Sequence, residues 1–142
     1  MGLKLGSQEL ANECWRLQEI NDPQFMEAIQ GLSLSLLFVS CDCSGNEDRQ
    51  LAIVFDEGKF AEIIVSIKPA PSDLRTAPFD HTKYDFRVQA PVDVLIDMIK
   101  GQANMLETLP KVKVEGDFGK LMANAQGFMR FIEYLQNLDI EP

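Results

Sequence analysis

The sequence has few of the residue types that make catalytic and metal sites. Its 142 residues include one histidine, His81, and three cysteines, Cys14, Cys41 and Cys43. Two thiols and one histidine do not complete a structural zinc site, which takes four ligands. An odd cysteine count with a Cys-x-Cys pair does not make a disulfide framework. We expect Cys41 and Cys43 to share one face of a strand as small buried groups; a metal or redox role is the alternative.

Positive charge is scarce as well. Lys and Arg number 13 against 22 Asp and Glu, which gives a net charge of −9 at pH 7. Such a chain repels phosphate backbones and anionic lipid headgroups. We therefore do not expect nucleic acid as a partner, or electrostatic docking on an anionic membrane.

Long apolar runs are missing. The longest uncharged stretch, Ala28–Cys41, has 14 residues, whereas a membrane-spanning helix needs about 20. We expect no stable membrane insertion. Residues 1–7 lack the apolar segment of a signal peptide, and residues 140–142 carry no peroxisomal signal. With three cysteines that form no framework, the expectation is a reduced cytoplasmic protein.

Helical periodicity marks both ends of the chain. Near the N-terminus it predicts helices over Ser7–Ile20 and Pro23–Gln30, a lead-in within one domain that spans residues 1–142. Later it predicts a helix from Pro91 to Gly101 and a final one from Phe118 to about Leu138. Ser7, Asp22 and Asp117 are the expected caps.

Alternating apolar residues predict the strands between these helices. Five segments show the pattern: Leu32–Cys43, Arg49–Phe55, Phe60–Lys68, Tyr84–Ala90 and Lys111–Glu115. Short turns join the first three into an antiparallel meander. Because strands and helices cluster separately, we predict an α+β fold with helices on one sheet face.

Apparent catalytic motifs in the sequence are incomplete. His81 follows Asp80 in a Pro-rich loop, Pro69–Lys83, but no nucleophile motif accompanies it. The tripeptide Asp117-Phe118-Gly119 matches the Asp-Phe-Gly motif of protein kinases, yet the other kinase motifs are absent. We expect Asp117 to cap a helix and the protein not to be an enzyme.

Large, adaptable apolar side chains are plentiful. The chain has 9 Phe and 6 Met, and several lie on the broad apolar stripe of the final predicted helix, including Phe128 and Met129. Methionine fills irregular gaps and tolerates varied shapes. These side chains form either a packed core or the wall of an apolar cavity, and composition leaves both open.

Three segments of the sequence resemble those of a known family. They are the predicted strand Tyr84-Asp85-Phe86-Arg87-Val88, the predicted helix from Asp93 to Gly101, and the segment Val112-Lys113-Val114-Glu115-Gly116-Asp117, which leads from a predicted strand into the final predicted helix. In this order and spacing the chain resembles the sterol carrier protein 2 family. The resemblance implies an α+β fold with a five-stranded, mostly antiparallel sheet and helices over one face.

The resemblance also implies an apolar tunnel between sheet and helices. Carried over by position, its lining would be Leu36, Phe38, Phe86, Leu95, Ile96, Ile99, Phe118, Leu121, Met122 and Ala125. The implied function is a small carrier of an apolar ligand (an acyl chain, a sterol or an isoprenoid) without cofactor or covalent chemistry. The alternative is a non-catalytic interaction or oligomerisation module, such as a homodimer, whose cavity its own side chains fill.

Overall fold

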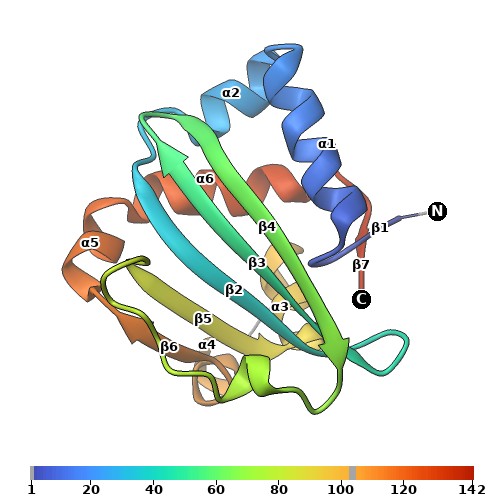
Figure 1. Ribbon diagram of the computed structural model, residues 1–142. Coiled ribbons are helices and arrows are strands. Elements are labelled where there is room, and N and C mark those ends of the chain that lie inside the picture. Colours follow the sequence, from blue (N-terminus) through green and yellow to red (C-terminus); the bar gives the residue numbers. More distant parts are fainter. Residues whose placement is uncertain (1, 103–104) are drawn as a thin grey trace.

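A mixed five-stranded sheet forms the centre of the protein. The computed structural model describes residues 2–102 and 105–142. The sheet runs in the order β4-β3-β2-β5-β6 (Figure 1), and its strands are β2 (Leu34–Cys43), β3 (Glu47–Asp56), β4 (Lys59–Pro69), β5 (Phe86–Pro91) and β6 (Lys113–Gly116). All five lie within two residues of the predicted segments. Among the strand pairs of this sheet in the described residues, the β2–β5 pair alone is parallel, so the predicted mostly antiparallel sheet is confirmed.

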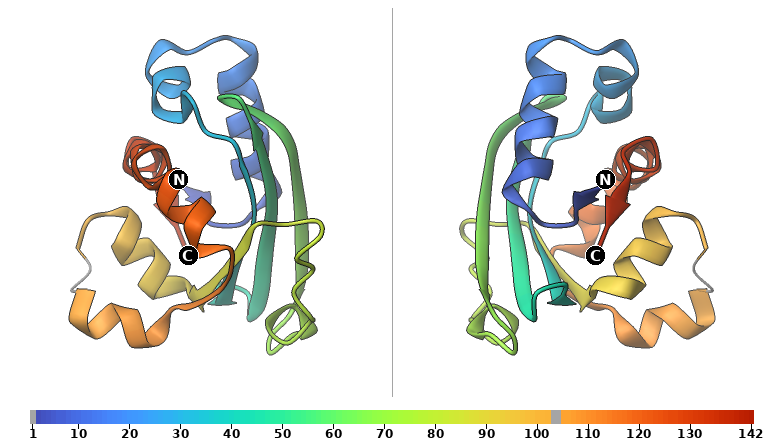
Figure 2. Two further views of the ribbon diagram at one scale, coloured as in Figure 1. Left: turned by 90° about the vertical axis from the view of Figure 1, so that its left-hand side faces the viewer. Right: turned by 90° about the vertical axis from the view of Figure 1, so that its right-hand side faces the viewer.

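Helices cover one face of this sheet. They are α1 (Gln8–Glu19), α2 (Pro23–Ile29), α3 (Val92–Ile99) and α6 (Ala125–Leu135). Figure 2 shows α3 and α6 on one side of the sheet and the connection after β4 on the other. We call the helix-covered side the front face and the opposite side the back face.

The connection from β4 to β5 crosses the back face. It contains one short 3-10 helix, η1 (Asp73–Arg75), and it delivers β5 beside β2, with Leu36 opposite Phe86 and Phe38 opposite Val88. β4 and β5 run in the same direction with β3 and β2 between them, so the connection has to return along the sheet, which takes a dozen or more residues. The length of the loop that the sequence predicts over Pro69–Lys83 therefore has a structural cause.

Side-chain caps position the helices at the residues expected from the sequence. Ser7 Oγ accepts from the Leu10 amide at 3.2 Å, and Asp22 Oδ1 accepts from the Phe25 amide at 3.0 Å. Asp117 Oδ1 likewise accepts from the Lys120 amide at 3.0 Å. Each carboxylate or hydroxyl satisfies an amide that has no partner within its own helix.

The Gly-Asp step before the last helices has a steric basis. Gly116 has φ +124°, and a Cβ there would lie 2.2 Å from the Asp85 carbonyl oxygen. The next amide, of Asp117, donates to that same oxygen at 2.7 Å. Glycine is required because the backbone leaves β6 in close contact with the start of β5.

The predicted single C-terminal helix is wrong: there are two helices. α5 (Phe118–Ala123) ends at Asn124, whose φ of −108° and ψ of 8° interrupt the helix before α6. The Asn124 amide nitrogen Nδ2 donates to the Lys120 carbonyl at 3.0 Å. Asparagine bonds locally to the backbone in this way and so favours helix ends over interiors. α6 ends at Leu135 rather than Leu138.

Phe131 of α6 anchors the C-terminal part of the chain in an aromatic cluster. Its ring contacts Phe55 and Phe60 edge-to-face, with centroids 5.4 and 5.9 Å apart, and those two rings lie 4.7 Å from each other. Gly127 allows the close approach, because a Cβ there would lie 2.8 Å from Cδ2 of Leu32.

The two short strands β1 and β7 have no sequence signal. β1 (Leu3–Lys4) pairs in parallel with β7 (Ile140–Glu141), which brings the two ends of the chain together. Two-residue strands are too short to show periodicity.

The segment before β6 contains α4 (Met105–Thr108) and the 3-10 helix η2 (Leu109–Lys111).

Candidate functional site

Acidic, histidine and cysteine side chains do not form a metal site in the described part of the chain. No group of three or more His, Cys, Asp or Glu within residues 2–102 and 105–142 is placed to hold a metal ion. His81 is exposed, and its ring meets the Phe79 ring edge-on with centroids 4.6 Å apart. None of the helices in these ranges combines the length and hydrophobicity needed to cross a membrane.

The two neighbouring cysteines lie on opposite faces of the sheet, so the expectation of a shared face is wrong. A bulge interrupts the β2–β3 register between Ser40 and Cys43, and Asp42 adopts a φ of 56° there. Cys41 packs with Val39 and Leu74 on the back face, while Cys43 joins the main core. Burial raises the pKa of Cys43 to about 11.

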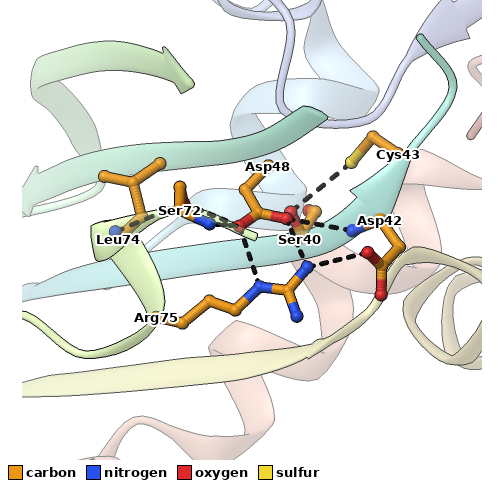
Figure 3. A network of polar contacts seen from close by, with 7 residues as sticks. All are labelled: Ser40, Asp42, Cys43, Asp48, Ser72, Leu74 and Arg75. Atoms are coloured by element: carbon orange, nitrogen blue, oxygen red, sulfur yellow. Dashed lines mark hydrogen bonds and ion pairs between the residues drawn. The ribbon is translucent and has the colours of Figure 1, made fainter. Parts of the chain in front are cut away.

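A carboxylate network lies on the back face, shown in Figure 3. Asp48 on β3 is fully buried. The Arg75 guanidinium donates to both Asp48 carboxylate oxygens at 2.8 Å. The Ser72 amide and hydroxyl donate to Oδ2 at 2.9 and 2.6 Å, and the Asp42 amide donates to Oδ1 at 3.0 Å.

This network stabilises the loop over the back face of the sheet. Burial alone raises the pKa of Asp48, but the hydrogen bonds from Arg75, Ser72 and Asp42 outweigh it and hold that pKa well below the ordinary value of 3.8. Asp48 is thus a carboxylate whose oxygens are already occupied by donors. It attaches η1 to the strands and is not available for acid–base chemistry.

The front face contains a partly open apolar groove of about 270 Å³. We call it the outer groove. Strands β2 and β5 form its floor. Its walls are α3 with the following Gly101 on one side and α6 on the other. Its lining is Phe38, Val88, Leu95, Met98, Ile99, Gly101, Phe128, Met129 and Ile132. No charged side chain is among them, so the groove offers apolar contact and little else.

A second, smaller space lies deeper on the same face. This inner cavity has a volume of about 30 Å³, room for about two water-sized spheres. α1, α6 and strands β2, β3 and β4 enclose it, together with Leu5. Its lining is Leu5, Leu10, Ala11, Cys14, Leu36, Phe38, Leu51, Ile53, Phe60, Ile63, Phe128, Phe131, Ile132 and Leu135. Burial raises the pKa of its one thiol, Cys14, to about 12.

The structure places part of the predicted tunnel lining at these two spaces. Phe38, Leu95 and Ile99 line the outer groove. Leu36 lines the inner cavity together with Phe38. The remaining buried members, Phe86 and Ile96, belong to the main core.

The predicted lining residues of α5 lie elsewhere. Phe118 is 57% exposed and Met122 is 73% exposed. Leu121 is partly buried. Ala125 is also partly buried, but it begins α6 and borders neither space. The interruption at Asn124 explains this placement, because α5 is a separate short helix with no buried residue.

Residues on α6 take the place of that half of the predicted lining. Phe128, Met129 and Ile132 face the outer groove, although the resemblance carried over only positions up to Ala125. The apolar stripe of the final predicted helix includes all three residues. That stripe was the available signal, but it does not separate residues that line a cavity from residues that fill a core.

Known proteins share this architecture. The sequence matches the model of the SCP-2 sterol transfer family over residues 17–129, whereas no curated protein sequence matches it. A conserved hypothetical protein from Thermus thermophilus, solved in solution, is 14% identical with a TM-score of 0.65, and the match covers 99% of this chain and 96% of that one.

The crystal structure of a sterol carrier protein 2 is similar to this chain to the same degree. It is also 14% identical, with a TM-score of 0.65 and coverage of 94% of this chain and 98% of that one. At this identity the two solved structures establish the fold alone. The family match extends over most of the chain, from α1 to α6, and includes all five strands of the main sheet. The chain therefore belongs to the SCP-2 sterol transfer family.

Proposed function

We propose that this protein binds a lipid in the outer groove and carries it without covalent chemistry. The observation that supports this most directly is the groove itself, an apolar space of about 270 Å³ between the sheet and helices α3 and α6. Membership of the SCP-2 sterol transfer family supports the same role. The ligand is an acyl chain, a sterol or an isoprenoid, with its polar end at the open side.

The energetics of such binding need no polar partner inside the groove. Each methylene removed from water contributes roughly 0.8 kcal/mol, so a chain of several methylenes offsets the cost of association. Methionine at the rim, Met98 and Met129, adapts to ligands of different shape.

Two measurements test this function. Organic extraction of the natively purified protein followed by mass spectrometry is expected to release a lipid. Titration with a fluorescent fatty acid is expected to show saturable binding that unlabelled oleate reverses. A protein that releases no lipid and gives no saturable signal would contradict the proposal.

A pair of matched variants locates the site. Met98→Glu places a carboxylate on a half-buried groove residue and is expected to weaken probe binding at least about tenfold, because an unpaired charge resists apolar surroundings. Met122→Glu makes the same change on α5, where Met122 is 73% exposed, and is expected to leave binding unchanged. If only Met122→Glu weakens binding, the site lies on α5 instead.

One observation favours the alternative function, an interaction or oligomerisation module. The inner cavity is almost filled by the protein's own side chains, with about 30 Å³ left. This alternative predicts a tight homodimer by light scattering together with no capacity for the fatty-acid probe.

A further inference from the structure

The outer groove and the inner cavity meet at a partition made of three side chains. Phe38, Phe128 and Ile132 line both spaces. About 270 Å³ lies on one side of them and about 30 Å³ on the other. The groove therefore ends at this partition, although apolar walls continue beyond it.

The volumes make the partition important for any long ligand. Small-molecule sites usually enclose about 300–1,000 Å³, and the outer groove lies just below that range. A long chain must either leave its distal end outside the groove or displace one of the three partition residues.

Phe128 is the partition residue with the most freedom to move. Phe38 is 9% exposed on the central strand β2. Ile132 is β-branched, and a helix holds such a side chain in one preferred rotamer. Phe128 is half-buried, and within the described part of the chain its ring has one aromatic neighbour, Phe86, with centroids 6.1 Å apart.

Phe131, on the same helix, is a ring that is held more firmly by its neighbours. It is 5% exposed and meets both Phe55 and Phe60 edge-to-face. Rotation of Phe131 would break two ring contacts, whereas rotation of Phe128 would break one and join the two spaces.

We propose that Phe128 sets the length of the acyl chain that this protein accepts. This inference rests on the proposed lipid-binding function. With the ring in its present position the outer groove ends at Phe128 and holds the proximal part of a single unbranched chain. When the ring turns aside, the groove and the inner cavity form one tunnel, and the distal methylenes enter it at the cost of displacing the ring.

The test compares octanoate, dodecanoate and hexadecanoate as competitors of a fluorescent fatty acid. In water-to-apolar transfer each buried methylene strengthens binding about fourfold. In the wild-type protein we expect this gain while the chain fills the groove and a smaller gain beyond. In Phe128→Ala the full gain continues, so the ratio of hexadecanoate to octanoate affinity rises at least about tenfold.

Further variants keep the test decisive. Phe128→Leu, which retains more of the packing, is expected to move the ratio in the same direction by a smaller factor. Met129→Ala alters a residue that lines the groove but not the inner cavity, so it is expected to change all three affinities alike and leave the ratio as it is.

The outcomes separate this inference from the function on which it rests. If the wild-type protein binds fatty acids and the Phe128 variants, still folded by circular dichroism, keep the wild-type ratio, Phe128 does not set chain length. If neither the wild-type protein nor any variant binds a fatty acid, the lipid-binding function itself is contradicted.

Discussion

The two faces of the sheet are built on different physical principles. On the front face, α3 and α6 pack against the sheet through apolar contacts that border the outer groove, while Gln18 of α1 also bonds the Phe60 backbone of β4. On the back face, a loop is held by directional bonds from Arg75, Ser72 and Asp42 to one buried carboxylate, Asp48. Apolar contacts are non-directional and can rearrange around a guest, whereas a satisfied polar network favours one geometry.

The comparison explains why one chain contains both arrangements. The proposed lipid-binding function needs one adaptable surface, and the sheet that supports this surface must keep its own strand order. The back-face network holds the long crossover between β4 and β5, on which the parallel β2–β5 pair depends. Because β2 and β5 form the floor of the outer groove, stability on the back face preserves the site on the front.

The largest effect is expected where the front face is packed most firmly. Phe131→Ala should lower the free energy of unfolding by about 4 kcal/mol, the usual cost of deleting a buried phenyl ring. Phe128→Ala, which removes a half-buried ring from the preceding turn of the same helix, should cost about 2 kcal/mol. Urea denaturation measures both, and equal losses would show that the two rings are packed alike.

A second large effect is expected on the back face. Asp48→Asn should lower the free energy of unfolding by about 3 kcal/mol at neutral pH, because it leaves Arg75 without its buried partner. Asp73→Asn is the matched control: Asp73 pairs with Lys68 in the same loop, but both side chains are exposed, so no measurable change is expected. As long as the protein stays folded, fatty-acid affinity should survive both changes, because neither residue lines the outer groove. A loss of affinity in folded Asp48→Asn would show that the network shapes the groove beyond keeping the protein folded.

The pH dependence of the Asp48 effect follows from its lowered pKa. A carboxylate with a native pKa below its unfolded value stabilises the fold fully above the unfolded value. That value is 3.8, and the contribution is lost as pH falls below it toward the native pKa. The stability difference between the wild-type protein and Asp48→Asn should therefore be constant from pH 7 to about 5 and shrink in stronger acid. A difference that grew on acidification would contradict this assignment.

The smallest effects are expected at the buried thiols of the front face. Burial raises the pKa of Cys14 to about 12 and that of Cys43 to about 11. Both remain protonated in the native protein at pH 8 and should react with Ellman's reagent far more slowly than in urea. Because the unfolded thiols ionise near 9.0, stability should also decline modestly above pH 9. Rapid native labelling of Cys14 would show that the inner cavity opens to solvent.

Local sequence signals predicted most of the secondary structure. Alternation located every strand of the main sheet, and Ser7, Asp22 and Asp117 marked the starts of helices. These signals succeed because a cap or a half-buried strand depends on residues only a few positions apart. The bulge at Asp42 and the break at Asn124 escape them, since each interrupts an otherwise regular pattern at one residue.

The site was predictable only in part. The family resemblance predicted Phe38, Leu95 and Ile99 as lining residues, and all three line the outer groove. It also predicted a wall formed by Phe118 and Met122 of α5, but both side chains are exposed. The apolar stripe contains Phe128, Met129 and Ile132, of which Phe128 and Ile132 are half-buried and Met129 is 53% exposed at the edge of the groove. Whether an inward side chain fills a core or borders a cavity depends on what lies opposite, which periodicity does not contain.

The sequence by itself determined the α+β class, the positions of the strands in the main sheet and most of the helix starts, because each of these depends on composition or on short-range spacing. Only the tertiary structure decided that β5 pairs with β2, that Asp48 and Arg75 meet across the crossover, and that Phe128 stands between two apolar spaces. Those contacts join residues far apart in the chain. Their energies depend on shape and burial after folding, and no local pattern specifies either.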